Sequence, residues 1–203
     1  MSKFITFEGC DGVGKSTQIA FVKEFLESKG KKVMLTREPG GTPLAEKLRE
    51  IIIKENMDVI TEAHLFAAAR SEHLINKIIP ALNDGYYVLC DRFIDSSLAY
   101  QGYARGLGFE RVLEINRFTV ENKMPDATIF IDMEPSNTWR KQSSMVIEDD
   151  KYEAETLEFH KKVYEGFKTL AKTEDRFISI VPEFEKKQTT EKIIKGLIDK
   201  GII

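Results

Sequence analysis

The sequence predicts an α/β fold of three layers, in which a parallel sheet of five strands is covered by helices on both faces. Five short apolar segments rich in β-branched residues alternate with helix-length amphipathic segments. That alternation is typical of parallel strands joined by helical crossovers. The chain has 203 residues, 42% of them hydrophobic, enough for one domain with a sizeable core. We therefore expect a single domain over residues 1–203.

Each element is expected where the hydrophobic pattern and the flanking residues indicate it. The five strands are expected at residues 3–8, 32–36, 86–90, 127–132 and 177–181. Helices are expected at residues 15–29, 43–54, 61–84, 95–101, 110–121, near 136–141, 153–172 and 189–199. Thr61 is a suitable N-cap for the longest of these helices, and Pro80 should kink or interrupt it near its end.

The least patterned part of the chain is the polar and acidic stretch at residues 142–151. Such a stretch between two helices is either a mobile lid or an ordinary loop, and composition alone favours the loop. We take residues 142–152 as the candidate lid segment of the domain.

Charge and cysteine content favour neither a nucleic acid nor a membrane as a partner. Lys and Arg number 30 against 33 Asp and Glu, for a formal net charge of −3, so no overall basic field would hold a polyanion. No uncharged apolar run approaches the roughly 18 residues of a membrane span, and we expect no signal peptide. Cys10 and Cys90 are the only cysteines and lack metal-ligand spacing, which indicates small buried residues in a reducing cytoplasm.

A phosphate-binding motif follows the first predicted strand. Residues 9–16 read G-C-D-G-V-G-K-S and fit the P-loop pattern G-x-x-x-x-G-K-[ST]. The glycines let backbone N–H groups curl around an anion, and the N-terminus of the next helix adds positive charge. Lys15 should reach the β- and γ-phosphates of ATP, and the Ser16 hydroxyl should ligate Mg²⁺. The fold is therefore expected to be that of a P-loop NTPase, with ATP bound by Gly9, Cys10, Asp11, Gly12, Val13, Gly14, Lys15, Ser16 and Thr17.

A P-loop indicates a nucleotide but not a reaction. A GTPase is disfavoured because the chain lacks a well-spaced N-K-x-D motif, the nearest stretch at 122–126 being one residue too long. Arg37 and Arg92 follow the second and third predicted strands. Because ligands of open α/β sheets bind at the carboxyl ends of strands, both arginines should face the P-loop and contact phosphate. This arrangement favours a phosphoryl-transfer kinase.

Two pairs of side chains suggest a pocket for the acceptor. Phe66 and Arg70 are spaced i, i+4 on the long helix and share a face. Ser97 and Gln101 have the same spacing in the short helical stretch. An aromatic plate for a base with a guanidinium beside its edge is one interpretation of the first pair. On spacing alone, a core phenylalanine beside a solvated arginine is the commoner arrangement.

Four motifs, in order, resemble the bacterial thymidylate kinases. They are the residues from Phe7 to Thr17, T-R-E-P-G-G-T at 36–42, D-R-F at 91–93 and S-S-L-A-Y-Q-G at 96–102. The resemblance runs from about residue 3 to residue 133 and continues weakly to the end of the chain. It implies the reaction ATP + dTMP → ADP + dTDP with Mg²⁺ as cofactor, in a homodimer.

The resemblance also implies residue roles. Asp11 would hold the 3′-hydroxyl of dTMP, and Glu38 and Pro39 would form a cis peptide at the border of the thymine pocket. Phe66 would stack on thymine, whose edge would be read by Arg70, Ser97 and Gln101. Tyr100 would crowd the sugar 2′ position. The implied catalytic residues are Lys15, Arg37, Asp91 and Arg92, and Asp91 would share the Mg²⁺ with Ser16. The full implied set for dTMP is Asp11, Arg37, Glu38, Pro39, Arg49, Phe66, Arg70, Arg92, Ser96, Ser97, Tyr100 and Gln101.

The sequence departs from the family pattern at the lid. Gly12 stands in the P-loop where other members carry an arginine, and members without that arginine usually supply basic residues from the lid. Residues 142–150 contain no Lys or Arg. We therefore hypothesise that Arg140 or Lys141 supplies the missing catalytic charge. Three alternatives remain open: a kinase of another monophosphate, a deoxynucleoside kinase with Glu38 as base, and a silent nucleotide-binding regulator, which the acidic lid favours.

Overall fold

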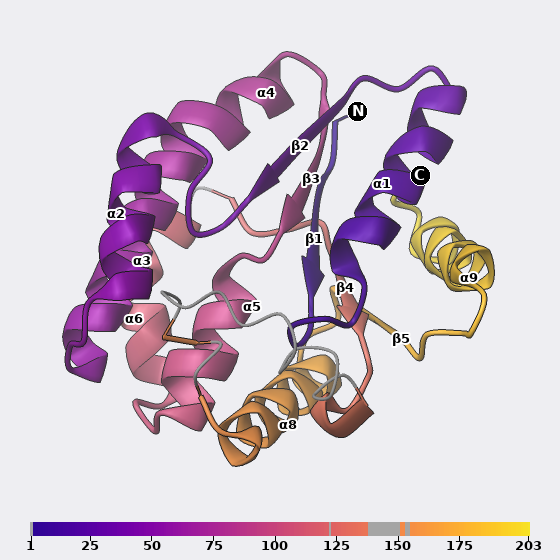
Figure 1. Cartoon of the computed structure of the whole chain (residues 1–203). Coiled ribbons are helices and arrows are strands. Elements are labelled where there is room, and N and C mark those ends of the chain that lie inside the picture. Colours follow the sequence, from indigo (N-terminus) through magenta and orange to yellow (C-terminus); the bar gives the residue numbers. More distant parts are fainter. Residues whose placement is uncertain (1, 122, 138–150, 153–154) are drawn as a thin grey trace.

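The computed structural model describes residues 2–121, 123–137, 151–152 and 155–203. In this part of the chain, five parallel strands form one sheet in the order β2-β3-β1-β4-β5 (Figure 1). The predicted five-stranded parallel sheet is thus confirmed. The strands are β1 (Phe4–Glu8), β2 (Val33–Arg37), β3 (Tyr87–Asp91), β4 (Ala127–Ile131) and β5 (Phe177–Ile180).

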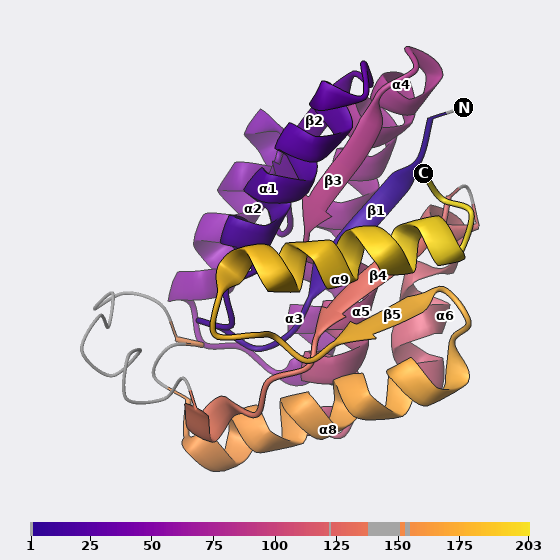
Figure 2. The same ribbon diagram turned by 90° about the vertical axis from the view of Figure 1, so that its right-hand side faces the viewer.

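Helices cover both faces of the sheet, as the alternation of elements predicted. Helices α1 (Lys15–Ser28) and α9 (Lys186–Asp199) lie on one face. The opposite face carries the other helices, and α2 packs against α3 (Figures 1 and 2). Their bounds are α2 (Pro43–Lys54), α3 (Val59–His73), α4 (Ile79–Asn83), α5 (Ile94–Ser97), α6 (Phe109–Val120) and α8 (Leu157–Thr173). Shorter elements are the π-helices η1 (Leu74–Ile78) and η2 (Leu98–Ala104) and the 3₁₀ helix η3 (Pro135–Asn137).

The long predicted helix at 61–84 is divided into three pieces. The prediction of Thr61 as N-cap is wrong: Asp58 caps α3, because its carboxylate accepts the backbone N–H groups of Ile60 and Thr61. An aspartate is among the best N-caps, and it lets the helix begin at Val59. Pro80 interrupts the helix as expected, since the π-helical turn η1 directly precedes the short helix that contains it.

Other helix predictions also differ from the structure, and the helix expected at 189–199 begins three residues earlier, at Lys186. The helical stretch expected at 95–101 continues to Ala104, because π-helix η2 follows α5. The helix expected at 153–172 begins only at Leu157, where the Thr156 hydroxyl accepts the N–H of Phe159. Of the helix expected near 136–141, the described residues contain η3 alone, and the remainder lies outside the described ranges.

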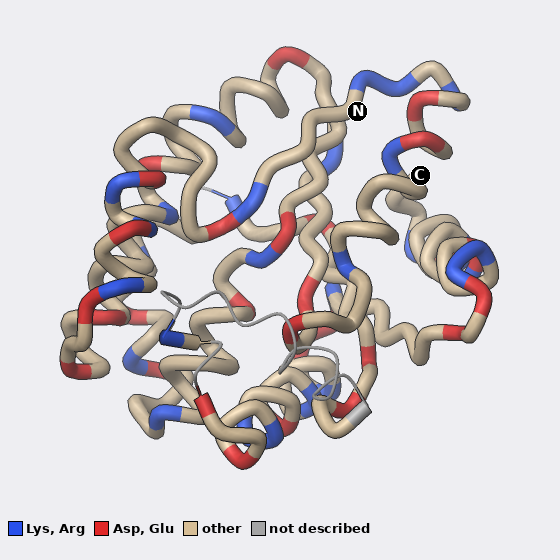
Figure 3. The backbone as a smooth tube through the Cα atoms, in the orientation of Figure 1, with Lys and Arg blue, Asp and Glu red and all other residues tan. Residues whose placement is uncertain are grey.

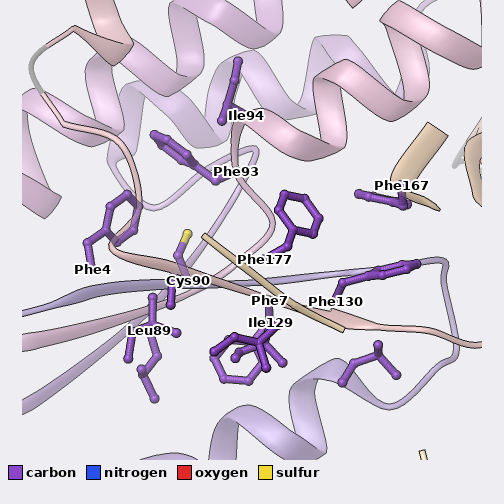
Figure 4. Packing of buried hydrophobic residues seen from close by; sticks show 14 of the residues in the cluster. Phe4, Phe7, Leu89, Cys90, Phe93, Ile94, Ile129, Phe130, Phe167 and Phe177 are labelled. Atoms are coloured by element: carbon purple, nitrogen blue, oxygen red, sulfur yellow. The ribbon is translucent and has the colours of Figure 1, made fainter. Parts of the chain in front are cut away.

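The core lies on both faces of the central strands (Figure 4). Strands β1 and β4 are buried along their whole length, whereas the edge strand β2 is only partly buried. The Phe4 ring packs edge-on against Phe93 at 5.0 Å, and the Phe130 ring stacks on Phe167 at 5.5 Å. Both cysteines are buried and free, as predicted.

Acidic and basic residues are intermingled along the backbone (Figure 3), in keeping with the small net charge. Among the described helices, none is long and apolar enough to cross a lipid bilayer.

The parallel register brings the predicted site residues to one edge of the sheet. Asp91 at the end of β3 lies opposite Phe7 of β1 on one side and opposite Arg37 of β2 on the other. The P-loop leaves β1 at the same edge and leads into α1. Carboxyl ends of parallel strands therefore converge here, where ligands of such sheets bind.

Candidate active site

A cavity of about 470 Å³ opens at this edge of the sheet. Its size suits a small-molecule ligand. The P-loop, the β2–α2 loop, α3 and η2 all contribute to its walls. Most of the predicted site residues line it, namely Asp11, Gly12, Gly14, Lys15, Ser16, Thr17, Arg37, Glu38, Pro39, Arg49, Phe66, Asp91, Arg92, Ser96, Tyr100 and Gln101. Of the predicted residues that the structure describes, Gly9, Cys10, Val13, Arg70 and Ser97 do not line it.

The P-loop curls around the Lys15 side chain. Gly12 and Gly14 adopt left-handed φ values of 74° and 95°, which a side chain would strain. The Lys15 ammonium is buried and donates to the carbonyl oxygens of Gly9 and Cys10, at 3.2 and 2.9 Å. Burial, together with the neighbouring Arg92 guanidinium, lowers the pKa of Lys15. An anion such as a phosphate, bound next to the Lys15 ammonium, would favour the charged form of this lysine.

Arg92 reaches the P-loop from β3, and the predicted convergence of the two is confirmed. The backbone of Arg92 has a φ of 69°, unusual for a residue with a side chain. Its guanidinium donates to Asp11 Oδ1 at 2.7 Å and to Ser96 Oγ at 3.0 Å, and lies 5.3 Å from the centre of the Tyr100 ring. Burial would raise the pKa of Asp11, but Arg92 and then Lys15 outweigh it and hold that pKa well below its usual range.

Ser16 and Asp91 form a site whose chemistry fits Mg²⁺. The Ser16 hydroxyl lies 3.2 Å from Asp91 Oδ2. Oδ1 of Asp91 is buried and has no hydrogen-bond partner among the described residues. Mg²⁺ takes oxygen ligands and is usually held by one or two protein groups plus substrate phosphates. The described residues contain no group of three or more His, Cys, Asp or Glu side chains that could hold a metal ion.

Glu38, on the cavity wall, forms a buried ion pair with Arg70, which does not line the cavity. Arg70 Nε donates to Glu38 Oε2 at 2.9 Å, and His73 Nδ1 lies 3.1 Å from Glu38 Oε1. The two remaining Arg70 nitrogens donate to Asn116 Oδ1 at 2.7 Å and to Ser97 Oγ at 2.9 Å. Every guanidinium nitrogen of Arg70 is therefore engaged by the protein. The peptide between Glu38 and Pro39 is cis, as the resemblance implied.

Sequence reasoning missed three residues that shape the site. Ile53 and Tyr152 line the cavity, and the Tyr152 ring lies 6.2 Å from the Phe66 ring and 6.0 Å from that of Tyr100. Behind the cavity, Glu8 accepts the Phe93 N–H at 2.7 Å and the Ser96 hydroxyl at 2.6 Å. Glu8 could have been found from its position, as a charged residue at the end of an otherwise apolar strand. Tyr152 carries no such signal.

Burial raises the pKa of Glu8 to about 8, and the nearby Asp95 adds to the effect. Glu8 therefore holds its proton to a higher pH than an ordinary glutamate does, at the base of the turn that carries Arg92.

Only the end of the candidate lid lies within the described residues. The Lys151 ammonium pairs with Glu62 at 3.1 Å, and the backbone N–H of Lys151 donates to the Ile53 carbonyl at 3.1 Å. Arg140 and Lys141, the predicted sources of the missing positive charge, lie outside the described residues. Their catalytic assignment stays a hypothesis.

A phosphate loop, a facing arginine and an aromatic-lined cavity on a five-stranded parallel sheet define a P-loop kinase of small molecules. Comparison with known proteins narrows this class. The thymidylate kinase family profile matches residues 7–193, and the chain belongs to this family of nucleoside monophosphate kinases.

Individual relatives agree with the family assignment. The thymidylate kinases of Bacillus thuringiensis (strain Al Hakam) and Bacillus cereus (strain 03BB102) are each 46% identical over 202 residues, covering 97% of both chains. The crystal structure of thymidylate kinase from Ehrlichia chaffeensis superposes with a TM-score of 0.78 at 35% identity. That match covers 97% of this chain and 98% of the other.

Proposed function

We propose that the protein transfers the γ-phosphate of ATP to dTMP, giving ADP and dTDP, with Mg²⁺ as cofactor. The observation that carries the proposal is the convergence of Lys15 and Arg92 on one cavity, which Phe66 also lines. One of these cations begins helix α1 after the P-loop and the other follows strand β3, and two cations on one cavity suit a reaction in which two phosphate groups must be brought together. The names of the relatives supply the identity of the acceptor.

The reaction requires no protein base. A phosphate monoester has a second pKa near 6, so the acceptor is already mostly a dianion at pH 7. An acceptor oxygen attacks the γ-phosphorus, and the bond from that phosphorus to the bridging oxygen breaks with its electron pair leaving on ADP. Among the histidines, His73 is fully buried and contacts Thr36 and Glu38, which suits a structural role.

Catalysis then depends on alignment and on neutralising charge. Lys15 is suited to the β- and γ-phosphates, and Arg92 to the phosphate groups of both substrates. Arg92 is held by Asp11 and Ser96, which restricts its side chain before substrate binds. Ser16 and Asp91 would hold Mg²⁺, which supplies further charge neutralisation on the transferring phosphate.

The other walls of the cavity suit a deoxynucleotide. Phe66, Pro39 and Gln101 line it together, offering an apolar surface and one amide to a base. Tyr100 donates its hydroxyl to Asp11 Oδ2 at 3.2 Å, so its ring occupies the space beside the carboxylate proposed to bind the 3′-hydroxyl. We propose that this ring excludes a 2′-hydroxyl.

A coupled ADP-release assay tests the proposal across dTMP, dUMP, thymidine, CMP and AMP. We expect dTMP to be the best acceptor by kcat/KM. Turnover of thymidine without turnover of dTMP would overturn the assignment. That alternative also requires Glu38 as a free base, whereas both its carboxylate oxygens already contact Arg70 and His73.

The regulator alternative makes a different prediction for the same assay. A silent regulator would bind ATP without forming ADP from any acceptor, and Arg92→Ala would not change its affinity for ATP.

The lid hypothesis is tested by Arg140→Ala and Lys141→Ala. If each variant keeps kcat within about twofold of the parent, neither residue supplies the missing charge. The homodimer implied by the resemblance and the cytoplasmic location expected from the cysteine content stay predictions.

A further inference from the structure

One polar group on the cavity wall is held in a single orientation by a residue outside the cavity. The Gln101 side chain is 1% exposed, and its Nε2 donates to Glu62 Oε1 at 2.7 Å. Its Oε1 is buried and has no hydrogen-bond partner among the described residues. A buried polar atom without a partner is costly, and in a residue that lines a substrate cavity it indicates a ligand that completes it.

The chemistry of Glu62 decides which end of the Gln101 amide is available. Glu62 is 2% exposed, and its carboxylate pairs with Arg105 at 3.1 Å and with Lys151 at 3.1 Å. A carboxylate held between two cations only accepts hydrogen bonds. The NH₂ group of Gln101 must therefore face Glu62. This partner decides which end of the Gln101 amide is the nitrogen and which is the oxygen. The carbonyl oxygen is what Gln101 can offer to a ligand.

We propose that Glu62 is a positioning residue for base selection, which it exerts by making Gln101 a hydrogen-bond acceptor. The proposal rests on the proposed function and deepens it. Thymine and uracil carry an N–H at ring position 3, which such an acceptor can bind. Cytosine carries an unprotonated acceptor nitrogen at that position, so two acceptors would meet and Gln101 Oε1 would stay unsatisfied. A site built to bind an N–H strongly rejects an analogue that lacks it.

The variant Glu62→Gln tests this inference. A glutamine at position 62 can accept or donate, so the Gln101 amide becomes free to turn its NH₂ group toward the cavity. We expect the preference for dTMP over dCMP to fall by about tenfold or more, the scale of one unsatisfied buried hydrogen bond. The change should appear in Kd from titration calorimetry and in KM, with kcat for dTMP little changed.

Deoxyuridine monophosphate provides an internal control for loosening of the cavity. Uracil keeps the N–H at position 3, so the ratio of Kd values for dTMP and dUMP should be unchanged in Glu62→Gln. A matched variant is Glu155→Gln, which removes the other carboxylate on Arg105, 2.8 Å from its Nη2, without touching Gln101. Glu155→Gln should leave the preference for dTMP over dCMP and the preference for dTMP over dUMP at their original values.

Glu62→Gln leaves Arg105 with one partner fewer, and a variant that does not fold would not test the inference. A second variant covers that case. The double variant Glu62→Gln with Arg105→Gln removes the carboxylate and one of its two cations, with Arg105→Gln alone as its control. A folded variant that keeps the original preference for dTMP over dCMP overturns the positioning role, as does an equal fall in the preference over dUMP. A parent protein that does not phosphorylate dTMP overturns the proposed function itself, and the inference with it.

Discussion

Replacing Arg70 with methionine tests whether this arginine is a structural group or a base-reading one. The change removes the buried partner of Glu38, whose side chain is 3% exposed, and leaves the carboxylate with His73 alone. Methionine keeps an apolar chain of similar length. Asn116 and Ser97 each lose the hydrogen bond that Arg70 donates to them. The perturbation is therefore the loss of charge compensation in the protein interior.

The expected magnitude follows from the burial of the pair. Removing one member of a buried ion pair typically costs about 3–5 kcal/mol, because the other charge stays buried without compensation. For a chain of this size each kcal/mol lowers Tm by roughly 2–4 °C. We expect Arg70→Met to melt roughly 6–20 °C below the parent. The half-exposed pair between Arg37 and Glu46, at 3.0 Å, supplies the matched control. Arg37→Met should cost about 0–1 kcal/mol.

Calorimetry of a double-mutant cycle completes the test. Glu38→Gln removes the charge that Arg70 compensates. The loss in free energy of unfolding for the double variant should therefore be about 2 kcal/mol smaller than the sum of the losses for the two single variants. The reasoning is refuted if Arg70→Met costs no more than Arg37→Met. A normal Tm combined with a large rise in KM for dTMP would instead support the role that the resemblance implied for Arg70.

Three further perturbations follow from the geometry. Glu8→Gln should flatten the pH dependence of stability: in the parent the free energy of unfolding falls as pH rises from about 4.5 to about 8, because native Glu8 keeps a proton that the unfolded chain has lost. Denaturant titrations at pH 5 and 8.5 measure this, and parallel behaviour of the two proteins would contradict it. Asp91→Asn should raise the Mg²⁺ concentration for half-maximal ADP release by about tenfold or more, and an unchanged Mg²⁺ titration would remove Asp91 from the metal site. Gly41→Ala should lower stability by about 1–3 kcal/mol, since φ is 93° and the new Cβ would lie 2.5 Å from the His73 ring. A Tm within 1 °C of the parent would show that the loop can shift.

The sequence was a reliable guide to the P-loop and to both strand-end arginines. The cradle around Lys15 is local, since its glycines and the helix that follows lie within a few residues of one another. Arg92 could be assigned to the same cavity because a parallel sheet brings the carboxyl ends of its strands together. The N-cap of α3 was assigned to Thr61 instead of Asp58 because both residue types cap well and the hydrophobic pattern does not decide between positions three residues apart.

Residue type and spacing could not decide the orientation of side chains on α3. The i, i+4 spacing of Phe66 and Arg70 indicates that they share a face of the helix, but it does not indicate what that face packs against. Phe66 lines the cavity, whereas Arg70 lies behind it among Glu38, Asn116 and Ser97. A fully buried arginine is uncommon, so on composition alone a solvated one was the better expectation.

By itself, the sequence determined the parallel sheet, the phosphate loop and the family, because periodicity and motif spacing are properties of short stretches of chain. Only the tertiary structure decided that Tyr152 joins Phe66 at the cavity and that Glu62 holds Gln101 in one orientation. Those contacts join residues 86 and 39 positions apart in the chain. Contacts at such separations form when the whole core packs, and no local pattern encodes them.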